Sequence, residues 1–337
     1  MRVLVTGGAG YIGSHTVLAL LRAGHEVHVL DDFSNASPEA LARVGAMTNG
    51  RIGLTRGDVR KDSALDAAME GFGPEAVIHF AGKKAVGESE SAPLLYYDIN
   101  VGGTVALLAA MDRHGCGGIV FSSSATVYGS PDYLPLDEDH PTRPANPYGR
   151  TKLMSEGIIA DWAGATDGAS AISLRYFNPV GADVSARIGE DPIGVPDNLM
   201  PFIAQVAIGR RKELAIFGAD WPTRDGTGER DYIHVSDLAE AHVAALAHVA
   251  GRTGYDVCNV GTGTGSTVLE MVAAFEAATG VAIPYRLTDR RPGDVKSYVA
   301  SVDKARDLLG WESRRDLPDM CGSTWAWQQA NPNGFRD

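Results

Sequence analysis

The sequence predicts an α/β fold: a Rossmann-type, doubly wound parallel sheet followed by a smaller carboxyl-terminal substrate domain. Short runs rich in β-branched residues alternate with longer amphipathic stretches through the first half of the chain. This rhythm is typical of a parallel sheet covered on both faces. A glycine-rich turn joins the first run to the first amphipathic stretch, as in folds that bind dinucleotides.

The elements of the first part follow this pattern in order. A helix is expected over residues 11–23, between the first two strands. The predicted strands are RVLVTG, EVHVLD, AVIHFAG, GIVFSSS and AISLRYF. The first domain is therefore expected to span residues 1–176.

After residue 177 the pattern loosens into turn-rich stretches, which we expect to wrap over a site. Residues 177–337 are the predicted substrate domain. Segments at about 230–260, "RDYIHV" among them, are expected to return to the first sheet. Further helices are expected near 199–209, 236–249 and 268–278.

Composition excludes several classes of function. The chain has 337 residues and a formal net charge of -12, which disfavours binding to nucleic acid or to an anionic membrane. Its three cysteines are far apart and form no CxxC pair, so neither a disulfide framework nor a zinc site is predicted, and a cytoplasmic location is expected. The start "MRVLVTGG" has the features of neither a signal peptide nor a membrane span. No cluster has metal-ligand spacing, so no metal is predicted, and His79 is expected to be a core histidine.

The glycine turn predicts a dinucleotide site. "VLVTGGAGYIGS" places Gly7, Gly10 and Gly13 between a strand and a helix, whose free N–H groups suit a pyrophosphate; the alternative is an ordinary turn. Asp31 ends the second strand, where its carboxylate can accept hydrogen bonds from a ribose diol and would repel a 2′-phosphate. NAD is therefore favoured over NADP. Asp58 ends a predicted third strand, where its carboxylate suits either the adenine amine or a helix-capping or turn role.

The segment "NPYGRTK" predicts a helix start. Asn146 can cap the helix and Pro147 suits its first position, so Tyr148 and Lys152 fall one turn apart on one face. An ordinary surface pair has the same spacing. As a catalytic pair, the ammonium and the positive ring of oxidised nicotinamide would lower the pKa of the phenol and make it a base.

A neighbouring segment, "FSSSATVYG", offers hydroxyl groups for the same chemistry. It runs off the end of a predicted strand, where open α/β sheets bind ligands. Ser124 and Thr126 are the candidates to hold a substrate alcohol while its proton leaves.

These segments resemble the extended short-chain dehydrogenase/reductases, through "TGGAGYIG", "HFAG", "SSSATVYG" and the Tyr148/Lys152 pair. Within that family the chain is most similar to the UDP-sugar 4-epimerases. "HFAGKKAVGES", "LRYFNPVGA", "GEDPIGVPDNLMP" and "DGTGERDYIHV" match them in order and spacing over nearly the whole chain.

The resemblance implies reversible epimerisation at C4 of UDP-galactose and UDP-glucose through a 4-keto sugar, with transient reduction of bound NAD. Tyr148 would take the proton of the 4-hydroxyl, Ser124 and Thr126 would steer that hydroxyl, and Lys152 would bridge the nicotinamide ribose. The implied cofactor contacts are Gly7, Gly10, Tyr11, Ile12, Gly13, Asp31, Asn35, Asp58, Val59, Phe80, Ala81, Gly82, Lys84, Asn100, Tyr148, Lys152 and Phe177.

A substrate diphosphate needs fixed positive charge, and a guanidinium fork suits it. Arg230 and Arg291 match family positions that contact the nucleotide, although on the residues alone each would be a solvated loop arginine. Tyr298 matches the position that limits the sugar pocket, so little turnover of UDP-N-acetylglucosamine is expected; the alternative is an ordinary loop tyrosine. The implied substrate contacts are Ser124, Thr126, Tyr148, Asn178, Asn198, Leu199, Arg230, Arg291, Asp294 and Tyr298.

The same resemblance implies a homodimer, formed through helices at 94–113 and 148–162. Three rival functions stay open at this point. A 4,6-dehydratase would carry an Asp-Glu pair where this chain has Ala125 and Thr126, a nucleotide sensor would lack the tyrosine or lysine, and an ordinary dehydrogenase would release NADH.

Overall fold

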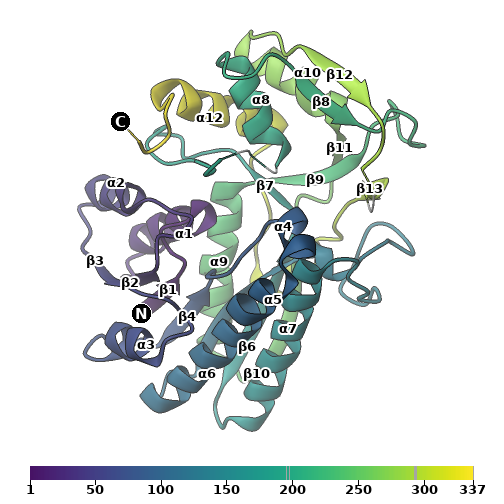
Figure 1. The fold of residues 1–337 in the computed structure, drawn as a ribbon. Coiled ribbons are helices and arrows are strands. Elements are labelled where there is room, and N and C mark those ends of the chain that lie inside the picture. The colour runs from purple at the N-terminus through teal and green to yellow at the C-terminus, as the bar shows by residue number, and fades with distance from the viewer. Residues whose placement is uncertain (195, 197, 292–293, 337) are drawn as a thin grey trace.

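The computed structural model describes residues 1–194, 196, 198–291 and 294–336 (Figure 1). A seven-stranded sheet forms the larger part of the molecule, and all of its neighbouring strands are parallel. From edge to edge the strands are β10 (Gly254–Val260), β6 (Ser170–Tyr176), β5 (Gly118–Ser124), β4 (Ala76–His79), β1 (Arg2–Thr6), β2 (Glu26–Asp31) and β3 (Ile52–Arg56).

Both faces of this sheet are apolar because both are covered by helices. In β1, Val3 and Val5 pack into one core and Leu4 into the other, as the alternation of a strand requires. One layer consists of α1 (Tyr11–Arg22), α2 (Pro38–Thr48), α9 (Val235–Val249) and α11 (Asp303–Leu309). The opposite layer consists of α3 (Asp62–Met69), α6 (Gly103–His114) and α7 (Pro147–Ala165).

The smaller part lies above the carboxyl ends of the large sheet in the view of Figure 1. Its helices share one core with two small sheets. The helices are α8 (Leu199–Ala207), α10 (Val268–Thr279) and α12 (Leu317–Ala330). The strands are β7 (Asn178–Val180), β9 (Glu229–His234), β11 (Gly265–Thr267) and β13 (Ser297–Tyr298) in one sheet, and β8 (Leu214–Phe217) and β12 (Tyr285–Thr288) in the other.

The prediction that "RDYIHV" returns to the first sheet is wrong. This segment forms β9, which pairs with β7, β11 and β13 in the smaller part. The elements that follow it do reach the large sheet, because α9 packs on α1 and β10 pairs with β6. A local sequence pattern can indicate a strand but does not specify its partner strand.

Residues 93–114 form one continuous helical stretch with a change of pitch. It begins with α5 (Pro93–Tyr96), passes through a π-helical segment (Tyr97–Gly102) and ends with α6; the short helix α4 (Val86–Ser91) precedes it. By length and composition this stretch could cross a membrane, but 44% of its most apolar window is buried in the fold. The core helices of soluble proteins pass the same test, so the indication is weak.

Four buried histidines predict that the protein loses stability in acid. Burial lowers the pKa to about 4 at His15 and His242 and to about 3 at His79 and His234. Each folded pKa lies below the unfolded value of about 6.5. The neutral, buried histidines therefore stabilise the fold fully above pH 6.5, and this stabilisation is lost as the pH falls toward the folded pKa. We expect the free energy of unfolding in urea to fall by about 2 kcal/mol per histidine between pH 7 and pH 5. A constant unfolding midpoint over this range would contradict the expectation.

Candidate active site

A cavity of about 1160 Å³ opens at the carboxyl ends of the large sheet, beneath the smaller part. Its lining includes the turn after β1, the residues after β4, the end of β5 and the residues after β6. This is the edge at which open parallel sheets bind ligands. All the site residues predicted from the sequence line this cavity except Asn100, Leu199 and Arg291.

The glycine turn is built for close contact with a ligand. Gly7 has a φ of +71°, and a Cβ on Gly13 would come within 2.3 Å of the Gly7 carbonyl oxygen. Helix α1 begins at the cavity with Gly10 as its N-cap, and no side chain there accepts a hydrogen bond from its first turn. These free N–H groups and the positive end of the helix dipole fit the pyrophosphate of a dinucleotide.

Two acidic residues follow the turn along the sheet edge. Asp31 is 7% exposed and accepts hydrogen bonds at 2.9 Å from the backbone N–H groups of Ala9 and Phe33. Burial raises the pKa of Asp31, and these two hydrogen bonds oppose that rise. Asp58 also lines the cavity, while its carboxylate is paired with Arg60, which holds its pKa below the usual range. The position of Asp31 at the cavity therefore suits a ribose diol. Asp58 both forms a local turn contact and lines the cavity.

Asn100 does not line the cavity, but its side chain supports the loop at Lys83, which does. Its side chain accepts from the Lys83 N–H at 2.8 Å and donates to the Lys83 carbonyl at 3.1 Å. It also donates to Thr151 at 3.0 Å. Asn100 lies in the π-helical segment, a local distortion that is frequent at functional sites. It therefore fixes the loop between Gly82 and Lys84, both of which line the cavity.

Tyr148, Lys152 and Ser124 meet at the inner end of the cavity. The cap prediction for α7 is confirmed: Asn146 accepts from the Gly149 N–H at 2.8 Å, and Pro147 occupies the first turn. Tyr148 and Lys152 consequently share a buried face. The Lys152 ammonium donates to the Ser122 carbonyl at 2.6 Å and lies 5.9 Å from the centre of the Tyr148 ring.

The hydroxyl groups of this end form a small network. Ser124 forms a hydrogen bond with Tyr148 and accepts from the Thr126 hydroxyl at 3.0 Å. The Thr126 N–H donates to the same serine oxygen at 3.2 Å. The hydroxyl groups of Tyr148, Ser124 and Thr126 are thus linked by hydrogen bonds at the cavity wall. A substrate alcohol bound there could exchange a proton with them.

The expectation that the pKa of Tyr148 is lowered is not met by the protein groups themselves. Burial raises it to about 12, and the hydrogen bond with Ser124 opposes this only in part. Burial also lowers the pKa of Lys152 to about 8, although the nearby Glu156 carboxylate acts in the opposite direction. Desolvation of the buried phenol, which no motif encodes, is the main cause of the raised pKa.

The predicted nucleotide contacts divide into two groups. Arg230 and Asp294 both line the cavity and form an ion pair with each other. Arg291 lies apart from the cavity lining, and its guanidinium carbon stands 3.9 Å from the centre of the Phe217 ring. Leu199, at the start of α8, packs against the core of the smaller part. A direct nucleotide contact of Arg291 or Leu199 stays a prediction.

Two aromatic side chains line the cavity and pack against the segment that follows Ser124. Phe177 and Tyr298 both line the cavity, with ring centres 6.4 Å apart. The Tyr298 hydroxyl donates to the Gly129 carbonyl, which fixes the ring. Its position agrees with a role in limiting the size of the sugar pocket, and this role stays a prediction.

Some cavity residues were not among the site residues predicted from the sequence. The Ser122 carbonyl, which holds Lys152, is a backbone group that motif reading does not reveal. Glu190 lines the cavity and pairs with Lys84 at 3.3 Å. Phe335 and Arg336, at the far end of the chain, also line it. Only the tertiary fold brings these residues together.

The parallel sheet, the glycine turn and the Ser–Tyr–Lys arrangement define a dinucleotide-dependent enzyme of the short-chain dehydrogenase/reductase type. Residues 3–261 match the NAD dependent epimerase/dehydratase family, and the chain belongs to this family.

Curated relatives and solved structures agree with this family over the full chain. The chain is 54% identical to a UDP-glucose 4-epimerase of Bacillus subtilis, with 100% of this chain and 99% of the relative covered. It is 52% identical to the UDP-glucose 4-epimerase of Homo sapiens, with 99% and 98% covered. The structure superposes with a TM-score of 0.96 on a UDP-glucose-4-epimerase from Stenotrophomonas maltophila with bound NAD and formylated UDP-arabinopyranose, at 48% identity over 98% of this chain and 99% of that one. The TM-score is 0.95 for the enzyme from Bifidobacterium longum in complex with NAD⁺ and UDP, at 47% identity over 99% and 100%.

Proposed function

We propose that this chain catalyses the reversible epimerisation at C4 of UDP-galactose and UDP-glucose, with NAD as its cofactor. The observation that carries the proposal is one cavity whose lining includes the Ser124–Tyr148–Lys152 group, the glycine turn and Arg230. The full-length similarity to enzymes with this activity supports it.

The residues of the chain have distinct tasks in this reaction. Tyr148, hydrogen-bonded to Ser124, exchanges the proton of the sugar 4-hydroxyl, and Thr126 helps to orient that hydroxyl. NAD, held by the glycine turn and Asp31, would supply a reversible hydride acceptor for C4 of the sugar. Lys152 is held by the Ser122 carbonyl beside the phenol, where its charge favours the phenolate. Arg230 and Asp294 would bind the nucleotide portion.

The structure also bears on the dehydratase alternative. Elimination of water needs an acid and a base beside the tyrosine. At the two positions concerned, Ala125 is buried and apolar, and Thr126 is bonded to Ser124. Neither side chain can serve as a carboxyl acid or carboxylate base, which favours epimerisation.

The deciding experiment is an incubation of purified protein with UDP-galactose without added cofactor. We expect UDP-glucose to form up to an equilibrium mixture, with no net absorbance from NADH. Stoichiometric NADH would indicate a dehydrogenase, a dehydrated keto sugar would indicate a dehydratase, and no reaction even with added NAD would indicate a sensor.

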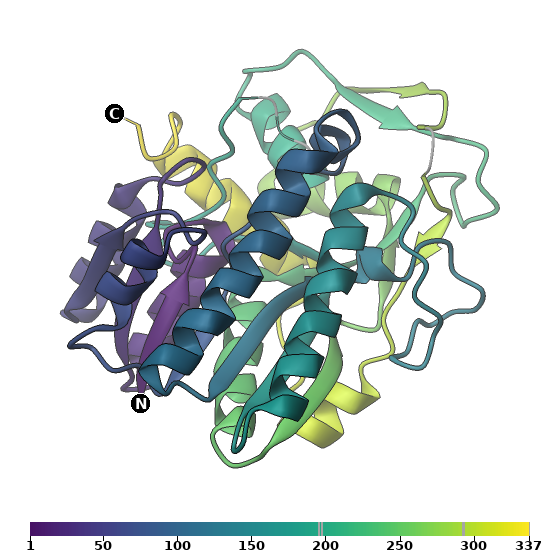
Figure 2. The ribbon, with the colours of Figure 1, turned by 60° about the horizontal axis from the view of Figure 1, so that its bottom comes forward.

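We also propose a homodimer formed through the helices at 94–113 and 148–162. These helices lie side by side in Figure 2 and pack on each other. They expose several apolar side chains, namely Leu94, Leu95, Val105 and Met154, which are 80%, 38%, 49% and 48% exposed. Covering such a face would remove apolar surface from water.

The dimer predicts a measurable change on mutation. Replacing Leu94 by Glu is expected to shift the light-scattering mass from dimer to monomer at micromolar concentration, because a charge would be buried at the interface. Tyr285→Glu is the matched control, since Tyr285 is 47% exposed on β12 and away from these helices. A monomer for the unaltered protein would contradict the proposal.

The three cysteines favour the proposed cytoplasmic location. Cys116, Cys258 and Cys321 are all buried and free, and such thiols are typical of a reducing compartment.

A further inference from the structure

We propose that residues 331–336, the carboxyl-terminal segment, retain bound NAD by fixing one wall of the cavity. The inference rests on the proposed function, because that function requires NAD to occupy the part of the cavity next to the glycine turn. The wall is formed by residues 189–193, here called the wall segment, all of which line the cavity together with Tyr11 and Lys84.

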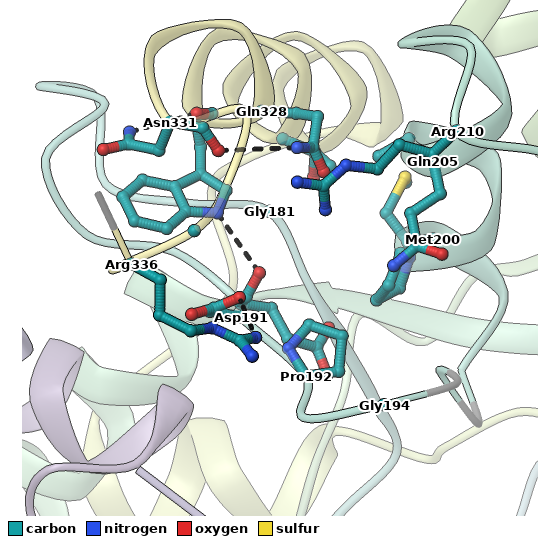
Figure 3. A pocket seen from close by; sticks show the side chains of 16 residues that line it. Gly181, Asp191, Pro192, Gly194, Met200, Gln205, Arg210, Gln328, Asn331 and Arg336 are labelled. Carbon is teal, nitrogen blue, oxygen red and sulfur yellow. Dashed lines mark hydrogen bonds and ion pairs between the residues drawn. The ribbon is translucent and has the colours of Figure 1, made fainter. Parts of the chain in front are cut away.

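The wall segment is thin. A second cavity of about 260 Å³ lies on its other side, between the wall segment, α8 and α12 (Figure 3). Glu190, Asp191, Pro192 and Arg336 line both cavities. Gly189 packs directly on Trp327, because a Cβ there would come within 2.4 Å of the indole ring. Residues 190–192 instead face the second cavity, so their position depends on specific contacts.

The carboxyl-terminal segment supplies several of these contacts through Asp191. The Phe335 N–H donates to one carboxylate oxygen at 3.0 Å, and the Arg336 guanidinium lies 3.6 Å from the other (Figure 3). The Trp327 indole donates to the Glu190 carbonyl at 3.2 Å. Gly334 packs directly on Asp191, because a Cβ on Gly334 would come within 2.0 Å of a carboxylate oxygen.

The same segment is anchored to the cofactor side of the large sheet. Arg43 of α2 donates to the Asn331 side chain at 2.6 Å and to the Arg187 carbonyl at 3.1 Å. Its guanidinium carbon lies 5.2 Å from the centre of the Phe335 ring. Helix α2 begins directly after residues 35–37, which line the cavity.

The wall segment is tied to the sheet on its other side as well, where Glu190 pairs with Lys84 at 3.3 Å. The wall segment is thus held on one side by the loop after β4. On the other side the carboxyl-terminal segment links it to α2. Departure of a dinucleotide past this wall requires these contacts to break. The segment is a set of positioning residues, and it should affect the rate of NAD loss more than the chemical step.

The test compares substitutions at two glycines that have nearly the same positive φ. Gly334 has a φ of +70° and Gly280, which ends α10, has a φ of +71°, so both alanine variants carry similar backbone strain. Only Gly334→Ala introduces a clash, because nothing lies within 4 Å of a Cβ on Gly280. We expect Gly334→Ala to lose NAD on the order of tenfold faster, the factor that a broken charge-assisted hydrogen bond gives, and Gly280→Ala to match the unaltered protein.

NAD loss is measured directly on NAD-loaded protein. After desalting, an NAD glycohydrolase destroys the cofactor as it dissociates, and the bound NAD that remains is extracted with acid at intervals and quantified. With saturating NAD added back, Gly334→Ala is expected to turn over UDP-galactose within about twofold of the unaltered protein, since the tenfold effect lies in dissociation alone. Equal rates of NAD loss for Gly334→Ala and the unaltered protein would overturn the inference.

A second variant covers the case in which Gly334→Ala does not fold. Arg43→Gln removes the anchor on α2 and is expected to speed NAD loss in the same direction. Retention at the unaltered rate in Arg43→Gln would also overturn the inference. An absence of epimerase activity in the unaltered protein would instead contradict the proposed function, and the extraction of bound NAD separates the two failures.

Discussion

Tyr148→Phe is expected to lower the turnover of UDP-galactose by about three orders of magnitude, within the range for loss of a general acid–base group. The substitution removes the hydroxyl that is bonded to Ser124 and leaves a buried ring of nearly the same shape. The fold and the bound NAD should therefore be retained. Turnover is measured from UDP-glucose formation at saturating substrate.

A second tyrosine provides the control for this variant. Tyr255 also has a buried hydroxyl partner, Ser173 at 3.0 Å, and it does not line the cavity. Tyr255→Phe should keep turnover within about threefold, since it removes one hydrogen bond away from the reaction. Near-normal turnover by Tyr148→Phe would show that another group takes the proton.

The raised pKa of Tyr148 means that the phenol needs additional stabilisation before it can act as a base at neutral pH. Burial raises the pKa to about 12, so the phenol by itself is protonated at neutral pH. Lys152, whose ammonium lies 5.9 Å from the centre of the Tyr148 ring, is itself desolvated, with its pKa lowered to about 8. The protein therefore prepares the geometry of proton transfer, and further positive charge beside the phenol is needed to lower its pKa.

The sequence predicted those parts of the site that are encoded within a few residues. The glycine turn, the Asn146 cap and the one-turn spacing of Tyr148 and Lys152 all depend on local backbone geometry, and the structure confirms them. Six of the seven parallel strands, all except β10, follow from the same local alternation of strands and helices.

Features that depend on tertiary neighbours could not be predicted in this way. The assignment of β9 to the first sheet was wrong because a local strand pattern does not specify the partner strand. The pKa of Tyr148 follows from burial, which no motif states. Phe335 reaches the cavity only because the chain folds back after α12, and it lies far in sequence from every motif of the site.

Tyr298→Ser is expected to admit UDP-N-acetylglucosamine as a substrate. The Tyr298 ring lines the cavity near Phe177, and its hydroxyl is fixed on the Gly129 carbonyl, so the ring cannot easily turn away from a larger sugar. Its removal should raise kcat/KM for the N-acetyl sugar on the order of 10- to 100-fold, the range over which pocket size discriminates between substrates. Epimerisation of this sugar is followed by chromatography of the two N-acetylated products.

Tyr298→Phe distinguishes the volume of this side chain from its hydrogen bond. It keeps the ring and loses only the bond to Gly129, so it should still exclude the N-acetyl sugar if size decides. Equal gains in the serine and phenylalanine variants would assign the selectivity to the hydroxyl and its hold on the backbone. Robust turnover of the N-acetyl sugar by the unaltered protein would show that Tyr298 does not limit the pocket. In each variant, turnover of UDP-galactose reports whether the proposed catalytic group, Ser124, Tyr148 and Lys152, has stayed intact.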